Sequence, residues 1–196
     1  MRKTMYRIIL LITLCLALIG QAQAQRYLPG QKGFQFTASA VDGFNLKNGD
    51  KQAFAVGVAF SNYRNFGDHW IFGAEYLQKK HAYKDILIPT TQFTAEGGYF
   101  LNYFASPRKT FLFSIGLSGM AGYETVNWGK ELLYDGSTIE NKEAILYGGA
   151  LSLEIEAFLS DRTILLIYGR ERLLFGSSIN KIHLQVGVGI KFIIND

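Results

Sequence analysis

The chain has 196 residues, enough for one domain of ordinary size, and a formal net charge of +4. Without the N-terminal Arg2, Lys3 and Arg7, 17 basic residues face 16 acidic ones, so the charge balance gives no reason to expect a nucleic-acid surface. The single cysteine, Cys15, lies in the same leading stretch, which excludes a disulfide framework from the remainder of the chain.

Residues 1–24 have the pattern of a secretory signal peptide. The basic MRKTMYR precedes an apolar run of about 13 residues, Ile8 to Gly20, shorter than the roughly 20 that a membrane-spanning helix needs. Ala22 and Ala24 then form an A-x-A site, which predicts cleavage before Gln25. A lipoprotein signal through Cys15 is disfavoured by the bulky Leu14 before it. We therefore expect residues 25–196 to form a single exported domain.

Eight segments follow in which apolar residues alternate with small or polar ones, the period of a β-strand. In chain order they cover residues 34–40, 53–61, 70–77, 92–103, 111–124, 145–156, 163–172 and 182–194. The first, third, fifth and seventh joins tend to be long and the others short; the third, residues 78–90, is expected to be a loop. This rhythm is typical of an up-and-down meander with one plain and one elaborated end.

Two closed architectures fit these strands: a soluble lipocalin-like barrel with the apolar stripe inside, and a membrane barrel with that stripe outside. The residues on the opposite face of each strand, which form a second stripe, decide between the two architectures. This stripe is rich in Gly, Ala and Ser, while the lysines sit mainly in joins or at strand ends. Small residues suit the interior of an eight-stranded barrel, which is only wide enough to be filled by side chains. The sequence predicts an all-β, eight-stranded antiparallel barrel of the outer-membrane type.

Charged residues in mid-strand support the same assignment. We expect Glu75, Glu96, Glu154 and Glu156 to point into the lumen, with Arg170 and Arg172 as their partners. Unpaired carboxylates in so narrow a space would be costly, so the lumen should hold an ion-pair network. On a lipid face, a charge near the midplane would cost up to about 2–4 kcal/mol.

Aromatic residues fall at two levels along the strands. One group lies near the short-join ends and the other near the long-join ends, as in the girdles that mark the two interfaces of a membrane. The first group is Phe34, Phe60, Trp70, Tyr103, Phe111 and Phe192, and the second is Tyr76, Phe93, Tyr123 and Tyr147.

Reactive side chains are few. Ser177, Ser178 and His183 cluster near one strand end, and with Glu124 they could form a lipid-cleaving triad. An ordinary loop sequence for the two serines and a polar lumen residue for His183 explain them better. The three histidines lack metal-ligand spacing, so we expect no metal, cofactor or small-molecule substrate. In the longest join, Tyr123, Trp128 and Tyr134 could form a contact surface for another protein; a self-packed loop cap explains them equally well.

Several stretches resemble the TraO family of conjugative transposon proteins from Bacteroides-type elements. They are AQRYLPGQKGFQFTA, FGAEYLQKKHAYKD, AGYETVNWGKELLYDG, RERLLFGSS and GVGIKFIIN, spread over residues 24–195. The resemblance implies a role in conjugative DNA transfer, as part of a cell-envelope mating apparatus, and it supplies no catalytic residues.

A filled eight-stranded barrel leaves no passage for a DNA strand. We therefore expect a structural outer-membrane component that anchors or docks other transfer proteins, without binding nucleic acid directly. Two alternatives remain: an outer-membrane lipid-modifying enzyme that uses His183, and a surface adhesion or defence barrel of the OmpX type.

Overall fold

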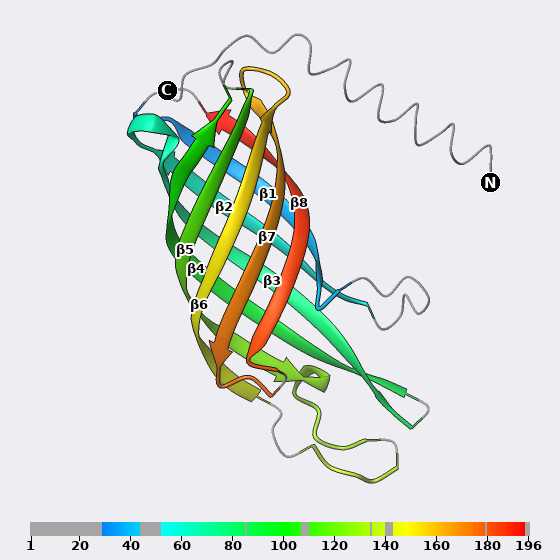
Figure 1. Ribbon diagram of the computed structural model, residues 1–196. Helices are drawn as coiled ribbons and strands as arrows, with labels where there is room; N and C mark the ends of the chain where they lie inside the picture. Colours follow the sequence, from blue (N-terminus) through cyan, green and yellow to red (C-terminus); the bar gives the residue numbers. More distant parts are fainter. Residues whose placement is uncertain are drawn as a thin grey trace, which may run out of the picture.

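Eight antiparallel strands close into a barrel in sequence order, with β8 pairing back onto β1 (Figure 1). The computed structural model describes residues 29–43, 52–84, 86–106, 110–133, 135–139, 143–178 and 180–194, so the expected signal peptide, residues 1–24, lies outside the described residues. The strands are β1 (Lys32–Val41), β2 (Ala53–Tyr63), β3 (His69–Tyr83), β4 (Ile86–Ala105), β5 (Phe111–Val126), β6 (Glu143–Phe158), β7 (Thr163–Phe175) and β8 (Ile182–Ile194). The predicted fold class is confirmed.

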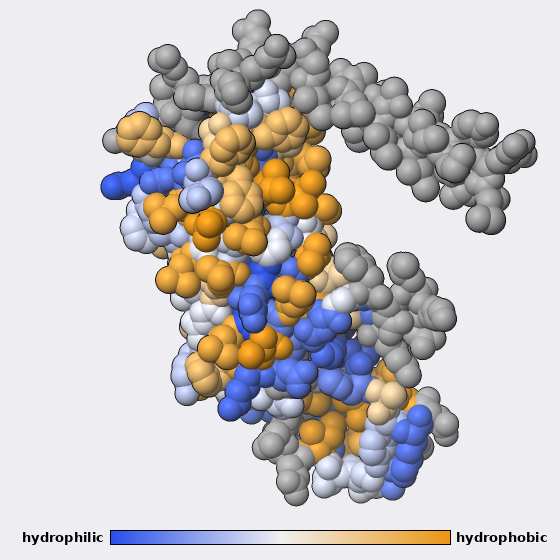
Figure 2. Space-filling model, viewed as in Figure 1, coloured by the Kyte–Doolittle hydropathy of each residue, from blue (hydrophilic) through white to orange (hydrophobic). Residues whose placement is uncertain are grey.

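The barrel wall is apolar outside and polar inside. Along β8, His183, Gln185 and Lys191 are fully buried, whereas the intervening side chains are exposed: Ile182, Leu184, Val186, Val188, Ile190 and Phe192. A protein surrounded by water has the reverse preference. Figure 2 shows apolar side chains over much of the wall that faces the viewer. Within the described ranges, no helix is long and apolar enough to cross a membrane.

Glycines on the inner face make room for large lumen side chains. A Cβ built on Gly116 would lie 2.5 Å from the ring of Phe100, and one on Gly187 would lie 2.7 Å from the ring of Tyr168. Both rings are buried inside the barrel. These glycines therefore allow aromatic side chains to fill the lumen, where a larger residue would collide with them.

The prediction of a loop at residues 78–90 is wrong. Strands β3 and β4 continue through it as a hairpin, in register from Gln78 opposite Thr91 to Tyr83 opposite Ile86. The hairpin extends past the end of the barrel (Figure 1). Beyond the barrel rim a strand has no apolar face to present to lipid, so it loses the alternation that identifies strands in the sequence. Of the residues that the structure describes, only Lys84 lies between the two strands, in the turn.

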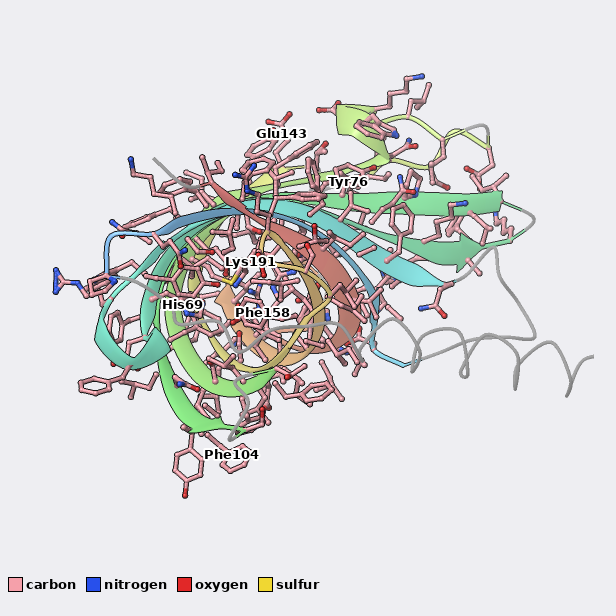
Figure 3. The ribbon with its side chains drawn as sticks, turned by 90° about the horizontal axis from the view of Figure 1, so that it is seen from above. His69, Tyr76, Phe104, Glu143, Phe158 and Lys191 are labelled. Atoms are coloured by element: carbon pink, nitrogen blue, oxygen red, sulfur yellow. The ribbon has the colours of Figure 1, made fainter. Side chains whose placement is uncertain are left out.

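An apolar cluster closes the end of the lumen that carries the short joins. It consists of Tyr63, Leu112, Phe158, Ile164, Leu166 and Ile193, all nearly or fully buried. Figure 3 looks into this end and shows Phe158 inside the ring of strands, close to Lys191, while Phe104 points outward. This end of the lumen is therefore packed with side chains.

Candidate functional site

The first charged cluster of the lumen joins β7 to β3 and β4. Arg172 Nη1 donates to Glu75 Oε1 at 2.7 Å, and Arg170 Nη2 donates to Glu96 Oε1 at 3.1 Å. Arg170 Nη1 also lies 3.6 Å from Glu75 Oε2. Gln185 Nε2 donates to Glu75 at 3.0 Å, so that this carboxylate is held from two strands. Two positive and two negative charges thus neutralise one another inside the barrel.

The second charged cluster lies nearer the short-join end and centres on Lys191. The Lys191 ammonium donates to Glu154 Oε1 at 3.2 Å and also to Glu156. The Tyr63 hydroxyl lies 2.9 Å from Lys191 Nζ and donates to Glu156 Oε1 at 2.8 Å. His69 stacks on Phe100, and its Nε2 lies 4.0 Å from Glu154. All these groups are at least nine-tenths buried.

The six charged residues expected in the lumen do lie there, but they divide between two clusters. Glu75 and Glu96 meet Arg170 and Arg172, as expected. Glu154 and Glu156 instead meet Lys191, which is not one of the six expected residues. Lys191 follows Gln185, Gly187 and Gly189 on the inward stripe of β8, and this alternation was the signal that could have identified it.

The described lumen side chains leave little free volume between the two clusters. A void of about 10 Å³, room for about one water molecule, is lined by Glu75, Glu96, Glu154 and Arg170 among others. Such a space could hold a hydrating water for the charges. It is far too small for a nucleic-acid strand.

The candidate catalytic group is brought to one end of the barrel but is not connected as a triad. Ser177 Oγ donates to Glu124 Oε2 at 2.8 Å, and both the backbone N–H and the hydroxyl of Ser178 donate to Glu124 Oε1. His183 Nδ1 is instead paired with Asp42 at 2.9 Å, and its Nε2 has no hydrogen-bond partner among the residues that the structure describes. The serines therefore face a carboxylate, and no imidazole is placed to accept their protons.

Asp42 links three strands at this end. Its carboxylate accepts hydrogen bonds from Lys79 at 2.6 Å and contacts His183. Partial burial acts to raise the pKa of Asp42, but the bonds with Lys79 and His183 outweigh it and place the pKa below its usual 3.8. Lys79 is on β3 and His183 is on β8, the strands that flank the β1–β2 pair. Asp42 therefore fastens the start of the β1–β2 loop to the strands on both sides of it.

The β3–β4 hairpin and the β5–β6 loop pack together beyond the barrel rim, and we call this contact the loop knob. The Tyr83 hydroxyl lies 3.2 Å from Asp135 and 3.1 Å from Ser137, and Lys84 pairs with Asp135. Bonding to Lys84 and to Ser137 holds the pKa of Asp135 well below its usual range. These contacts give the long loop a fixed position against the hairpin.

Of the three residues proposed as a contact surface, two are described. Trp128 sits in a short 3-10 turn, Asn127–Gly129, with a φ of 54° and 56% of its surface exposed. Tyr123 is 40% exposed on the outer wall, and its hydroxyl is hydrogen bonded to Glu143. Tyr134 lies outside the described residues. The exposed Trp128 ring, held on a strained turn, is not buried by the loop around it.

Comparison with solved structures identifies the same architecture in outer-membrane proteins. Neisserial surface protein A matches with a TM-score of 0.52 and 9% identity, over 86% of this chain and 99% of that one. The attachment invasion locus protein Ail of Yersinia pestis, solved with the heparin analogue sucrose octasulfate, matches with a TM-score of 0.53 and 11% identity, over 85% and 100%. At these identities the likeness concerns the fold alone.

Sequence comparison gives the family. A search of curated proteins finds no match. Residues 28–194, however, match the family described as conjugative transposon protein TraO, which agrees with the resemblance of the quoted stretches. This match over most of the chain identifies a component of conjugative transposons, and the outer-membrane type of barrel fits an envelope role. The chain belongs to the TraO family of conjugative transposon proteins.

Proposed function

We propose that this chain is a structural barrel of the outer membrane that anchors and docks other proteins of a conjugative DNA-transfer apparatus, and that the transferred DNA does not pass through it. The observation that carries the proposal is the filled lumen. Two ion-pair clusters and the Phe158 cluster occupy the space that a conduit would need. A barrel of this kind can contribute only its two ends and its outer wall to an assembly.

The two ends of the barrel differ in the length of their loops, so they would offer different docking surfaces. Outer-membrane barrels carry short turns on the periplasmic side and longer loops outside the cell. By this rule the Phe158 end faces the periplasm and the loop knob, with the exposed Trp128, faces outward. The proposed partners are other transfer proteins of the envelope, because the family is one of conjugation.

A deletion strain provides the first test. Donor cells that lack this protein should lose conjugative transfer, and the full-length chain should restore it. Separation of the inner and outer membranes should recover the protein with the outer membrane, and its gel mobility should change on heating, as intact barrels do. Normal mating in the deletion strain would refute the proposal.

A second test separates an anchor from a conduit. The purified barrel in a planar bilayer should show no sustained conductance, because its lumen is filled. In mating donors, formaldehyde crosslinking followed by precipitation of the barrel should recover envelope proteins but not the transferred strand. Recovery of that strand, at a level comparable with that of a component on the DNA path, would contradict the proposal.

A further inference from the structure

The outer wall carries one carboxylate where lipid contact is expected. Glu171, four residues before the end of β7, is exposed between the buried Arg170 and Arg172, so it points outward. The neighbouring strands place Leu151 and Leu184 directly opposite it, and both are exposed apolar residues. No ion pair or hydrogen bond within the described chain engages its carboxylate.

No other charged residue of the eight strands has this position. The Glu96 side chain is only 8% exposed and belongs to the first charged cluster. Seven other charged residues of the strands are buried in the lumen or at its rim: Glu75, Glu124, Glu154, Glu156, Arg170, Arg172 and Lys191. Lys32 and Glu143 are the first residues of β1 and β6, and Lys79 and Lys80 lie near the protruding hairpin. Glu171 is four residues from Phe175, which places it about 10 Å below that strand end for a rise of about 3.3 Å per residue and a tilt of about 35–45°.

The wall beside Glu171 is hollowed. A shallow depression of about 380 Å³ is lined by Leu117, Gly149, Ala150, Leu151, Glu171, Leu173 and Ile182. Gly149 also ends a row of glycines that lie side by side on the outer wall, Gly97 on β4, Gly119 on β5 and Gly149 on β6. In membranes, small residues allow another protein backbone to approach closely. The depression thus combines an apolar floor, room for a side chain and one negative charge.

We propose that this depression docks a membrane-embedded segment of a different envelope protein, and that a lysine or arginine of that segment pairs with Glu171. A cation at this depth would remove the cost of exposing a carboxylate to hydrocarbon. A second copy of this chain does not supply one, because its strands carry no outward cation away from their ends. This inference rests on the proposed docking role and names the surface and the chemistry of the partner.

The test places a photoactivatable amino acid at Leu173, beside Glu171, in the full-length protein of mating donor cells. The same group at Ile167, also exposed on β7, is the positional control. We expect a crosslink from position 173 to another transfer protein, weaker by tenfold or more in Glu171→Gln and unchanged in Glu143→Gln. Heat-dependent gel mobility checks that each variant has folded.

Charge reversal decides whether the pairing is direct. Glu171→Lys should abolish the crosslink, and changing the partner's membrane-facing lysine or arginine to glutamate should restore it. Absence of a crosslink, a crosslink only to a second copy, or one that is indifferent to Glu171→Gln would overturn the inference. If the deletion strain fails to mate while Glu171→Gln leaves the crosslink intact, this inference fails and the docking role stands. Normal mating in the deletion strain would instead remove the docking role itself.

Discussion

Lys191 on β8 and Glu154 on β6 form an ion pair of 3.2 Å across the inside of the barrel, although these strands are not neighbours. The same ammonium reaches Glu156, and Tyr63 joins the group from β2. One cation therefore ties three strands together through the lumen. Backbone pairing links each strand only to its neighbours, so these side chains supply the contacts that cross the barrel.

Replacement of Lys191 by methionine should destabilise the barrel strongly. Two buried carboxylates would lose their cation, and breaking a buried pair by removing one partner costs about 3–5 kcal/mol. Urea unfolding in phospholipid vesicles would measure the loss. Lys181→Met is the matched control, because Lys181 is exposed just before β8, and it should change stability by less than about 0.5 kcal/mol. Equal stability of the two variants would show that Lys191 is not essential to the network.

The strand alternation predicted most of this architecture. Because a strand turns every second side chain to the same face, Glu75, Glu96, Arg170 and Arg172 could be assigned to the lumen from the sequence alone. The choice of partners could not be predicted, since contacts across a lumen depend on the registers of all eight strands together. The position of Lys191 on the inward stripe therefore indicates a lumen side chain, but it does not indicate Glu154 as the partner.

Three other features could not be predicted, each for a different physical reason. The hairpin around Tyr83 and Lys84 carries no amphipathic pattern, because its strands stand beyond the barrel rim. Glu171 lies on the outward stripe of β7 between Gly169 and Leu173, and its position between two inward arginines hides the outward direction of its side chain in the sequence. The pairing of His183 with Asp42 also depends on a loop whose path no periodicity describes.

Arg172 and Glu75 should be energetically coupled. Arg172→Met leaves Glu75 with Arg170 and Gln185 as remaining partners, so we expect a loss near the lower end of the range, about 3 kcal/mol. Combining it with Glu75→Gln should cost less than the sum of the two single changes, by about 0.5–3 kcal/mol. A double-mutant cycle of unfolding free energies measures this difference, and strict additivity would mean that the two groups do not interact.

The loop knob should survive mild acid. The pKa of Asp135 lies below its ordinary value of 3.8, because Lys84 and Ser137 hydrogen bond to its carboxylate. The contribution of this contact is therefore complete above pH 3.8 and is lost only as the pH falls through the lower value of the folded state. Hydrogen exchange of the β3–β4 hairpin tip should be equal at pH 7 and pH 5, after correction for intrinsic rates. Asp135→Asn should raise it at both, whereas exchange that rises already at pH 5 would contradict this assignment.

Ser177 and Ser178 should hold the β7–β8 loop in place through their hydrogen bonds to Glu124. Ser178→Ala removes a hydroxyl that donates to Glu124, so it should increase proteolysis of the β7–β8 loop on intact cells. Ser178→Ala should leave the mating frequency unchanged. His183→Ala, which removes the contact between the imidazole and Asp42, should leave it unchanged as well. Loss of a lipid-cleaving activity in both variants, with the barrel still folded, would instead favour the enzymatic alternative.

The orientation of the two faces can be tested on a single strand. Val188 lies in the middle of β8 and Ile194 at its end, and both side chains point outward. An arginine on the lipid face of a barrel costs about 2–4 kcal/mol at the midplane and about 0–1 kcal/mol near an interface. Val188→Arg should therefore lower the unfolding free energy in vesicles by about 2–4 kcal/mol, and Ile194→Arg by no more than about 1 kcal/mol. If both arginines were tolerated equally, the outer wall would not be in hydrocarbon, because only a gradient of polarity across the barrel distinguishes these two positions.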